Sequence, residues 1–203
     1  MNDRKLVLPG EKIAEGKYRI PGAFVEGEAT YAAVIGILDA ENRFIPLENK
    51  YIPMAEDVLV GVITDSRHAG YDVDLNLPNN GFIPSRDIRL TLELGDFVMC
   101  KVREVTETGD VDVGEVRRLP KGKLVAFPCA KVPRLVGRQS SMINMIKEKV
   151  GDLVVGKNGY VWISEKANIP LAMETIKIIE EEAHFPGLTD RISAFLGSKM
   201  KVE

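Results

Sequence analysis

The sequence predicts a mixed fold built from three small domains: a β module at residues 1–52, a closed β-barrel at 53–118 and an α+β domain at 119–203. Three observations lead to this prediction. Short apolar runs separated by glycine turns occupy the first part. Cleaner alternation of apolar and polar residues, typical of half-buried strands, occupies the second. Helical spacing of apolar residues first appears after residue 140.

The N-terminal module is predicted to be all β. Turn dipeptides such as Pro9-Gly10 and Pro21-Gly22 separate its short segments. Residues 32–38 form an apolar run that predicts one buried strand. Residues 34–47 predict a hairpin whose turn lies at residues 39–42.

Five short strands are predicted in the second domain. Tyr71, Val73 and Leu75 alternate with acidic residues, as a half-buried strand requires. Five such strands with one long connection at residues 85–95 favour a small barrel of the OB type. The five predicted strands are at residues 58–63, 71–75, 81–84, 97–102 and 111–114.

Two motifs in this barrel resemble the S1 domain, an OB-fold RNA-binding module. One is Gly81-Phe82-Ile83-Pro84, and the other is the run from Gly95-Asp96 to Lys101-Val102. The first strand, with Gly61-Val62-Ile63-Thr64, is similar to the family as well. The resemblance implies a surface that binds single-stranded RNA.

The third domain is predicted to follow the order β-α-α-β-β-α. A strand at 123–127 precedes a helix at 141–150, strands at 152–155 and 160–163, a helix from Pro170 and a last helix at 189–200. This order resembles a type I KH domain, in which Gly137 would open the G-x-x-G loop. The second glycine of that loop is Ser140 here, which weakens its expected approach to a nucleic-acid backbone.

The combination of the three domains resembles the S1/KH cap subunits of the archaeal RNA exosome. The motif Gly156-Lys157-Asn158-Gly159 matches that family's G-x-N-G signature, in which Gly156, Asn158 and Gly159 have a structural role. Asn-Gly between apolar strands also predicts a tight hairpin turn, because both residues tolerate positive φ. The sister cap subunit carries a zinc ribbon, which two separated cysteines do not fit.

The resemblance implies a non-catalytic function without a cofactor. Three copies would sit on a hexameric ring of RNase PH-like subunits, in complexes that can also hold the zinc-ribbon sister. They would guide single-stranded RNA to the ring for 3′–5′ degradation and tailing. Residues 1–52 would dock to the ring through Val7, Leu8, Pro9 and the 32–38 strand.

Basic residues concentrate in one part of the chain. Residues 117–158 hold ten Lys or Arg and only two acidic residues, a net charge of +8. The whole chain carries −3, so the remainder carries −11. A basic block in an acidic chain indicates a polyanionic partner, although a solvated face without a partner gives the same pattern.

Two groups of residues are the candidates for RNA contact. On the barrel, aromatic rings would stack on bases and cations would meet phosphates. The alternative for Phe82 is a place in the barrel core, and Trp162 is predicted to be a buried anchor between domains. The barrel candidates are Arg67, His68, Tyr71, Phe82, Arg86, Lys101 and Arg103. The KH candidates are Arg117, Arg118, Lys121, Lys123, Arg134 and Arg138.

Other function classes are less well supported. An enzyme needs a nucleophile with its base or a metal cluster, and the two histidines, His68 and His184, form no such pattern. A free-standing S1/KH protein acting in translation or as an RNA chaperone is the main alternative. With no membrane-spanning run, no visible signal peptide and no disulfide pattern, the expected location is the cytoplasm.

Overall fold

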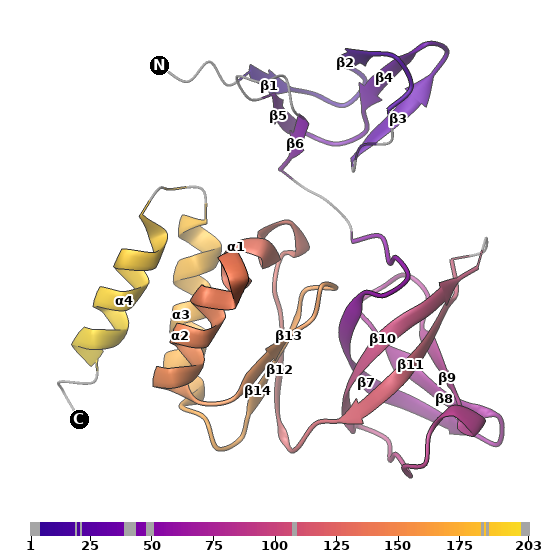
Figure 1. Cartoon of the computed structure of the whole chain (residues 1–203), viewed down its shortest axis with the longest axis vertical. Helices are drawn as coiled ribbons and strands as arrows, with labels where there is room; N and C mark the ends of the chain where they lie inside the picture. Colours follow the sequence, from indigo (N-terminus) through magenta and orange to yellow (C-terminus); the bar gives the residue numbers. More distant parts are fainter. Residues whose placement is uncertain are drawn as a thin grey trace. The chain divides into compact units, whose positions relative to one another are not determined.

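A computed structural model describes residues 5–18, 20, 22–38, 44–47, 51–106, 109–183, 185 and 187–199. His184 and the predicted turn at 39–42 lie outside the described residues. The chain divides into two compact units, Met1–Lys50 and Tyr51–Glu203 (Figure 1).

The first unit contains two three-stranded antiparallel sheets, ordered β1-β5-β6 and β2-β4-β3. Their strands are β1 (Lys5–Val7), β2 (Lys12–Glu15), β3 (Ala23–Glu26), β4 (Ala29–Ala32), β5 (Gly36–Leu38) and β6 (Phe44–Pro46). A small core of Val7, Ala32 and Phe44 holds the unit together.

The single strand predicted at 32–38 is wrong, because the run is divided between β4 and β5. The backbone N–H groups of Ala33 and Val34 both donate to the carbonyl of Gly22, at 2.8 and 3.3 Å, which turns the chain from one sheet to the other. The pairing of β5 with β6 confirms the predicted hairpin.

The second unit begins with a closed five-stranded barrel, ordered β10-β11-β9-β8-β7 (Figure 1). Its strands are β7 (Val58–Arg67), β8 (Gly70–Asp74), β9 (Gly81–Pro84), β10 (Phe97–Val105) and β11 (Val111–Arg118). Only β9 and β11 pair in parallel among these strands. Alternating side chains such as Val73 and Leu75 fill the interior, so the predicted OB-like barrel is confirmed.

The C-terminal α+β region follows the predicted order of elements. Its sheet is ordered β12-β14-β13, and α2, α3 and α4 cover one face of it (Figure 1). The helix α3 begins after Asn168, whose side-chain oxygen accepts a hydrogen bond from the N–H of Leu171 at 3.1 Å. The elements are β12 (Gly122–Ala126), α1 (Val132–Val136), α2 (Ser141–Val150), β13 (Leu153–Val155), β14 (Tyr160–Ser164), α3 (Ile169–Glu182) and α4 (Leu188–Lys199).

A separate apolar cluster joins this region to the barrel. Neighbouring residues of a strand point to opposite faces, so Val161 and Ile163 pack under the helices while Trp162 lies on the other face. Trp162 packs there with Val60 of β7 and Leu119. It is 3% exposed, as expected of a buried anchor. Among the described residues, no helix is both long and apolar enough to cross a membrane.

Candidate nucleic-acid interface

Two aromatic residues predicted to stack on RNA bases lie on neighbouring barrel strands. Tyr71 on β8 is half-buried and packs against the barrel core, and its hydroxyl accepts a hydrogen bond from the N–H of Leu92 at 3.4 Å. Phe82 on β9 is also half-buried but lies outside the core cluster. Phe82 is therefore the more available of the two rings.

The predicted barrel cations are already engaged with carboxylates. Arg67 pairs with Asp65 and Asp72 between β7 and β8. The two carboxylates raise the pKa of Arg67, with the hydrogen bond to Asp65 as the largest cause. The pair with Asp65 is exposed, and such pairs are weak, so a phosphate group can replace that carboxylate at little cost, whereas the side chain of Asp72 is only 14% exposed.

Three further barrel cations follow the same arrangement. Lys101 contacts Glu56 and Glu115, at 2.5 and 3.5 Å. Arg103 pairs with Asp87, and Arg86 lies 4.0 Å from the same carboxylate. The exposed residue His68 lies in the turn between β7 and β8.

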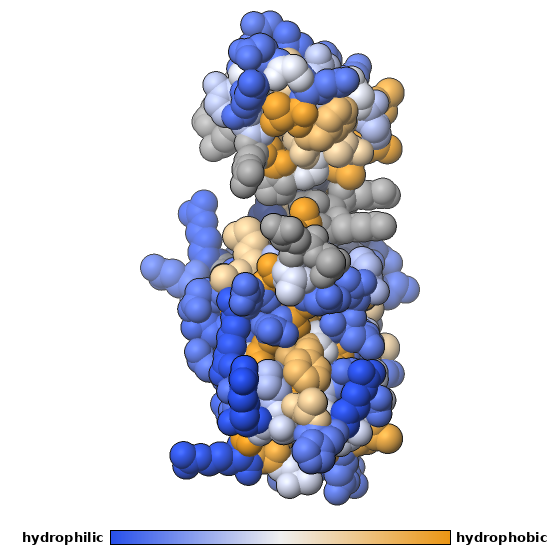
Figure 2. All heavy atoms as spheres, turned by 90° about the vertical axis from the view of Figure 1, so that its right-hand side faces the viewer, coloured by the Kyte–Doolittle hydropathy of each residue, from blue (hydrophilic) through white to orange (hydrophobic). Residues whose placement is uncertain are grey.

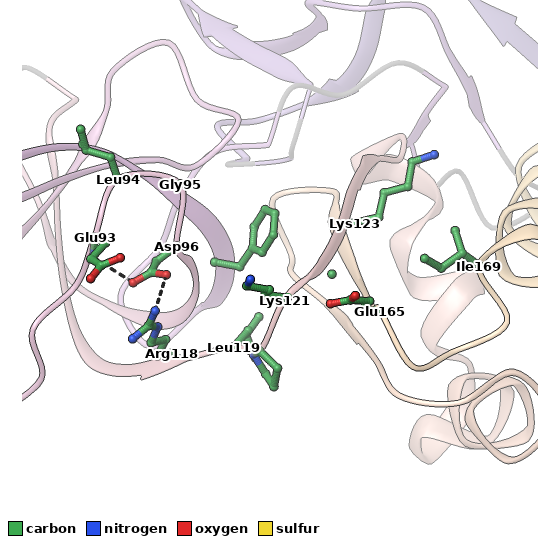
Figure 3. Close-up of a pocket in the computed structure, with 13 residues that line it drawn as sticks. Glu93, Leu94, Gly95, Asp96, Arg118, Leu119, Lys121, Lys123, Glu165 and Ile169 are labelled. Carbon is green, nitrogen blue, oxygen red and sulfur yellow. Dashed lines mark hydrogen bonds and ion pairs between the residues drawn. The ribbon is translucent and has the colours of Figure 1, made fainter.

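The connecting segment, residues 118–122, carries cations from the barrel to the C-terminal region. A pocket of about 790 Å³ lies along it. Figure 3 shows the guanidinium of Arg118 directed at Asp96 on one side, where their N–O distance is 2.8 Å, and Lys121 farther along the segment. Lys123 lies beyond it on β12, with its ammonium 3.1 Å from the sulfur of Met173.

The loop between α1 and α2 keeps an unusual backbone despite its serine. Gly137 has φ of 75°, and both Gln139 and Ser140 adopt left-handed conformations with φ of 49° and 61°. Such conformations are strained for residues that have a Cβ atom. Arg134 and Arg138 are exposed on either side of Gly137, and in the described part of the chain their side chains make no hydrogen bond or ion pair.

Asn158 has a role that its place in a turn did not reveal. It is fully buried, and its amide donates to the carbonyls of Val60 and Leu75 at 2.7 Å each. Its side-chain oxygen accepts from the N–H of Val60 at 3.3 Å. Asn158 therefore connects the C-terminal region to β7 and to the residue that follows β8. Of the two residues predicted to take a positive φ in the hairpin turn, Gly159 does so, with φ of +80°, and Asn158 does not.

The two glycines of this motif are required by space. A Cβ atom at Gly156 would lie 2.6 Å from the backbone nitrogen of Val60, and one at Gly159 would lie 2.2 Å from the carbonyl oxygen of Phe127. Both distances are too short for a side chain. Gly156 and Asn158 thus lie at the contact with the barrel, whereas Gly159 is required by close packing inside the C-terminal region.

Charged and polar side chains also join the barrel to the C-terminal region. The buried carboxylate of Asp57 accepts hydrogen bonds from Lys157 and from Tyr51, at 2.5 Å each. Burial works to raise the pKa of Asp57, but these hydrogen bonds outweigh it and leave that pKa below its ordinary value. Tyr160 donates to Asp74 at 2.8 Å, and its burial and this bond raise the pKa of Tyr160 to about 12.

Comparisons with known proteins place the chain in a family. A family model described as the N-terminal domain of the exosome RNA-binding protein Rrp4 matches residues 4–48. The exosome complex component Rrp4 of Methanothermobacter thermautotrophicus is 37% identical over 100% of this chain and 71% of its own length. That of Pyrococcus abyssi is 36% identical over 99% of this chain and 85% of its own. The chain belongs to the Rrp4 family.

A solved structure agrees with this membership in the Rrp4 family. A crystal structure titled as an exosome complex RNA-binding protein is 29% identical, with a TM-score of 0.66. The match covers 75% of this chain and 98% of that one. In the described part of this Rrp4-family chain, no group of three or more His, Cys, Asp or Glu side chains is arranged to hold a metal ion.

Proposed function

We propose that this chain is a non-catalytic cap subunit of an exosome-type complex that binds single-stranded RNA and guides it into a ring of RNase PH-like subunits. The RNA would then be degraded or extended at its 3′ end inside the ring. The observation that carries the proposal is the similarity, over 99% or more of the chain, to proteins named exosome complex component Rrp4.

The barrel supplies the chemistry for RNA contact. A partly exposed ring such as Phe82 can stack on a base of any identity, because every base has a π face. Arg67 and Lys101 can exchange the exposed carboxylates of Asp65 and Glu56 for phosphates. Such a surface suits a subunit that passes RNA of any sequence.

The N-terminal unit supplies an apolar face for docking. Leu6, Ile37 and Ile45 are direct partners across β1, β5 and β6, so they form one row on one face of the sheet. Leu6 is 58% and Ile45 50% exposed. Apolar side chains also gather on the face of this unit seen in Figure 2. A row of this kind indicates a protein partner.

The residues expected to make this contact need one correction. Val7 and Ala32 are buried in the core of the N-terminal unit and face away from solvent. The opposite face of the sheet, with Leu6 and Ile45, is the surface that we assign to the ring.

Salt dependence tests RNA binding by the full chain. If about four to six cations meet phosphates, log affinity falls with log salt at a slope near −0.7 per contact. Arg138→Ala is expected to weaken binding equally for all RNA sequences, since phosphate contacts carry no sequence information. A flat salt response would contradict the electrostatic part of the proposal.

Removal of the N-terminal unit tests the docking assignment. The unit ends at Lys50, so a chain that starts at Tyr51 keeps the barrel and the C-terminal region together. We expect this chain to retain its fold by circular dichroism and to lose association with purified RNase PH-like subunits. Association at the level of the full chain would reject the assignment, and RNA binding without any ring partner would favour a free-standing RNA-binding protein.

A further inference from the structure

A second cleft lies on the connecting segment, apart from the barrel face. Its volume is about 530 Å³, and it is formed where β10 and β11 meet α2, β13 and β14. Lys121 and Glu165 line both this cleft and the pocket of Figure 3. The volume lies in the range of about 300–1,000 Å³ that is usual for ligand sites.

Four cations converge on this cleft from separate elements: Arg117, Lys121, Lys147 and Lys166. All four are exposed, and within the described part of the chain none of their side chains makes a hydrogen bond or an ion pair. Two carboxylates, Asp152 and Glu165, line the same cleft, so its net charge is positive. We name it the basic cleft.

The cations of the basic cleft have no carboxylate partner among the described residues, whereas those of the barrel face do. There the predicted cations Arg67, Lys101 and Arg103 all pair with carboxylates. Four like charges held together without partners repel one another, and an anionic ligand removes that repulsion.

The wall of the basic cleft restricts the kind of anion. Its one aromatic residue, Trp162, is 3% exposed, so the ring cannot stack on a base. Three of the four cations are lysines, which act as point charges and do not form the planar fork that selects one phosphate geometry. The cleft is therefore suited to the repeated phosphates of a strand and not to recognition of bases.

We propose that the basic cleft binds the phosphate backbone of single-stranded RNA, as a contact additional to the barrel face. The proposal rests on the proposed function, because it assumes that RNA is the polyanion this chain meets. It adds Lys147 and Lys166 to the RNA-binding residues, neither of which is among the candidates from the sequence.

The test compares two double variants of the full chain. One is Lys147→Gln with Lys166→Gln, in the basic cleft. The matched control is Lys149→Gln with Lys177→Gln, which removes the same charge from exposed positions of α2 and α3 outside it. Binding of labelled oligoadenylate and oligouridylate of about 16 nucleotides is measured by fluorescence anisotropy at several salt concentrations.

We expect the cleft variant to bind both RNAs about tenfold more weakly near physiological salt, with a salt slope shallower by about 1.4. The control variant is expected to match the wild type, and both variants to melt at the wild-type temperature. A cleft variant with wild-type affinity and slope would overturn the proposal, as would a loss confined to one RNA. A wild-type chain that binds neither RNA would instead overturn the proposed function.

Discussion

The side-chain amide of Asn158 makes three buried hydrogen bonds, of which it donates two and accepts one. Asn158→Ala is expected to destabilise the Tyr51–Glu203 unit by about 3 kcal/mol, because it leaves buried backbone groups of Val60 and Leu75 unpaired. Urea unfolding followed by the fluorescence of Trp162, which packs beside Val60, measures the loss.

Two further variants separate the loss of these hydrogen bonds from a change in the conformation of the hairpin turn. Asn158→Asp keeps the shape but cannot donate to the two carbonyls, so it is expected to destabilise at least as much as the alanine variant. Asn76→Ala removes one bond, 2.9 Å long, from an exposed side chain and places alanine at a φ of 57°, so it is expected to cost about 2 kcal/mol in all. Equal losses from Asn76→Ala and Asn158→Ala would contradict the assigned role of Asn158.

At Ser140, in contrast, a substitution is expected to increase the stability of the chain. Its φ of 61° is strained for serine and free for glycine, so Ser140→Gly is expected to stabilise the chain by about 0.5–1 kcal/mol. The neighbouring Ser141 has φ of −62° at the start of α2, and Ser141→Gly is expected to destabilise by about 0.5 kcal/mol. Thermal melting of both variants measures the difference, and a destabilising Ser140→Gly would show that the loop is not strained.

At the scale of elements, the ion pair between Asp57, just before β7, and Lys157 of the β13–β14 hairpin makes the stability of the folded chain depend on pH. The pKa of Asp57 in the folded chain lies below the value near 3.9 of an unfolded aspartate. The charged form therefore stabilises the folded state above that pH, and this contribution is lost as the pH falls through the folded pKa.

Asp57→Asn isolates this contribution. We expect the variant to melt at a lower temperature than the wild type at pH 6 (roughly two units above the unfolded pKa) and the gap to narrow as the pH falls below about 3. Glu104→Gln, at an exposed position of β10, serves as the control and is expected to follow the wild type throughout. A gap for Asp57→Asn that does not change with pH would contradict the account.

The elements that the sequence predicted best are those whose pattern is local. Alternation along 71–75 placed a barrel strand correctly, and the apolar spacing of Met142, Ile143 and Ile146 placed α2. The strand predicted at 32–38 failed because a distant carbonyl, that of Gly22, divides it. The hydrogen-bond partners of Asn158 were likewise hidden, since they lie more than 80 residues away in the sequence.

At the scale of the whole molecule, charge counting identified a basic stretch of sequence but not how its cations are placed in space. The ten basic residues of 117–158 predicted a polyanion partner, yet sequence alone could not tell that Arg118 is paired with Asp96 or that Lys147 shares a cleft with Lys166. Pairing and convergence depend on tertiary structure. The apolar face of the N-terminal unit was predicted as a docking module, but which of its residues point outward follows only from strand register.

The central claim is that this chain acts on RNA as part of a ring-shaped assembly, and affinity capture from its own cell lysate tests it most directly. The full chain is expected to recover RNase PH-like subunits in stoichiometric amounts by mass spectrometry. A variant carrying Leu6→Lys and Ile45→Lys, both at exposed positions, is expected to lose them while keeping its fold. Recovery of ribosomal proteins or RNA alone by the full chain would contradict the account.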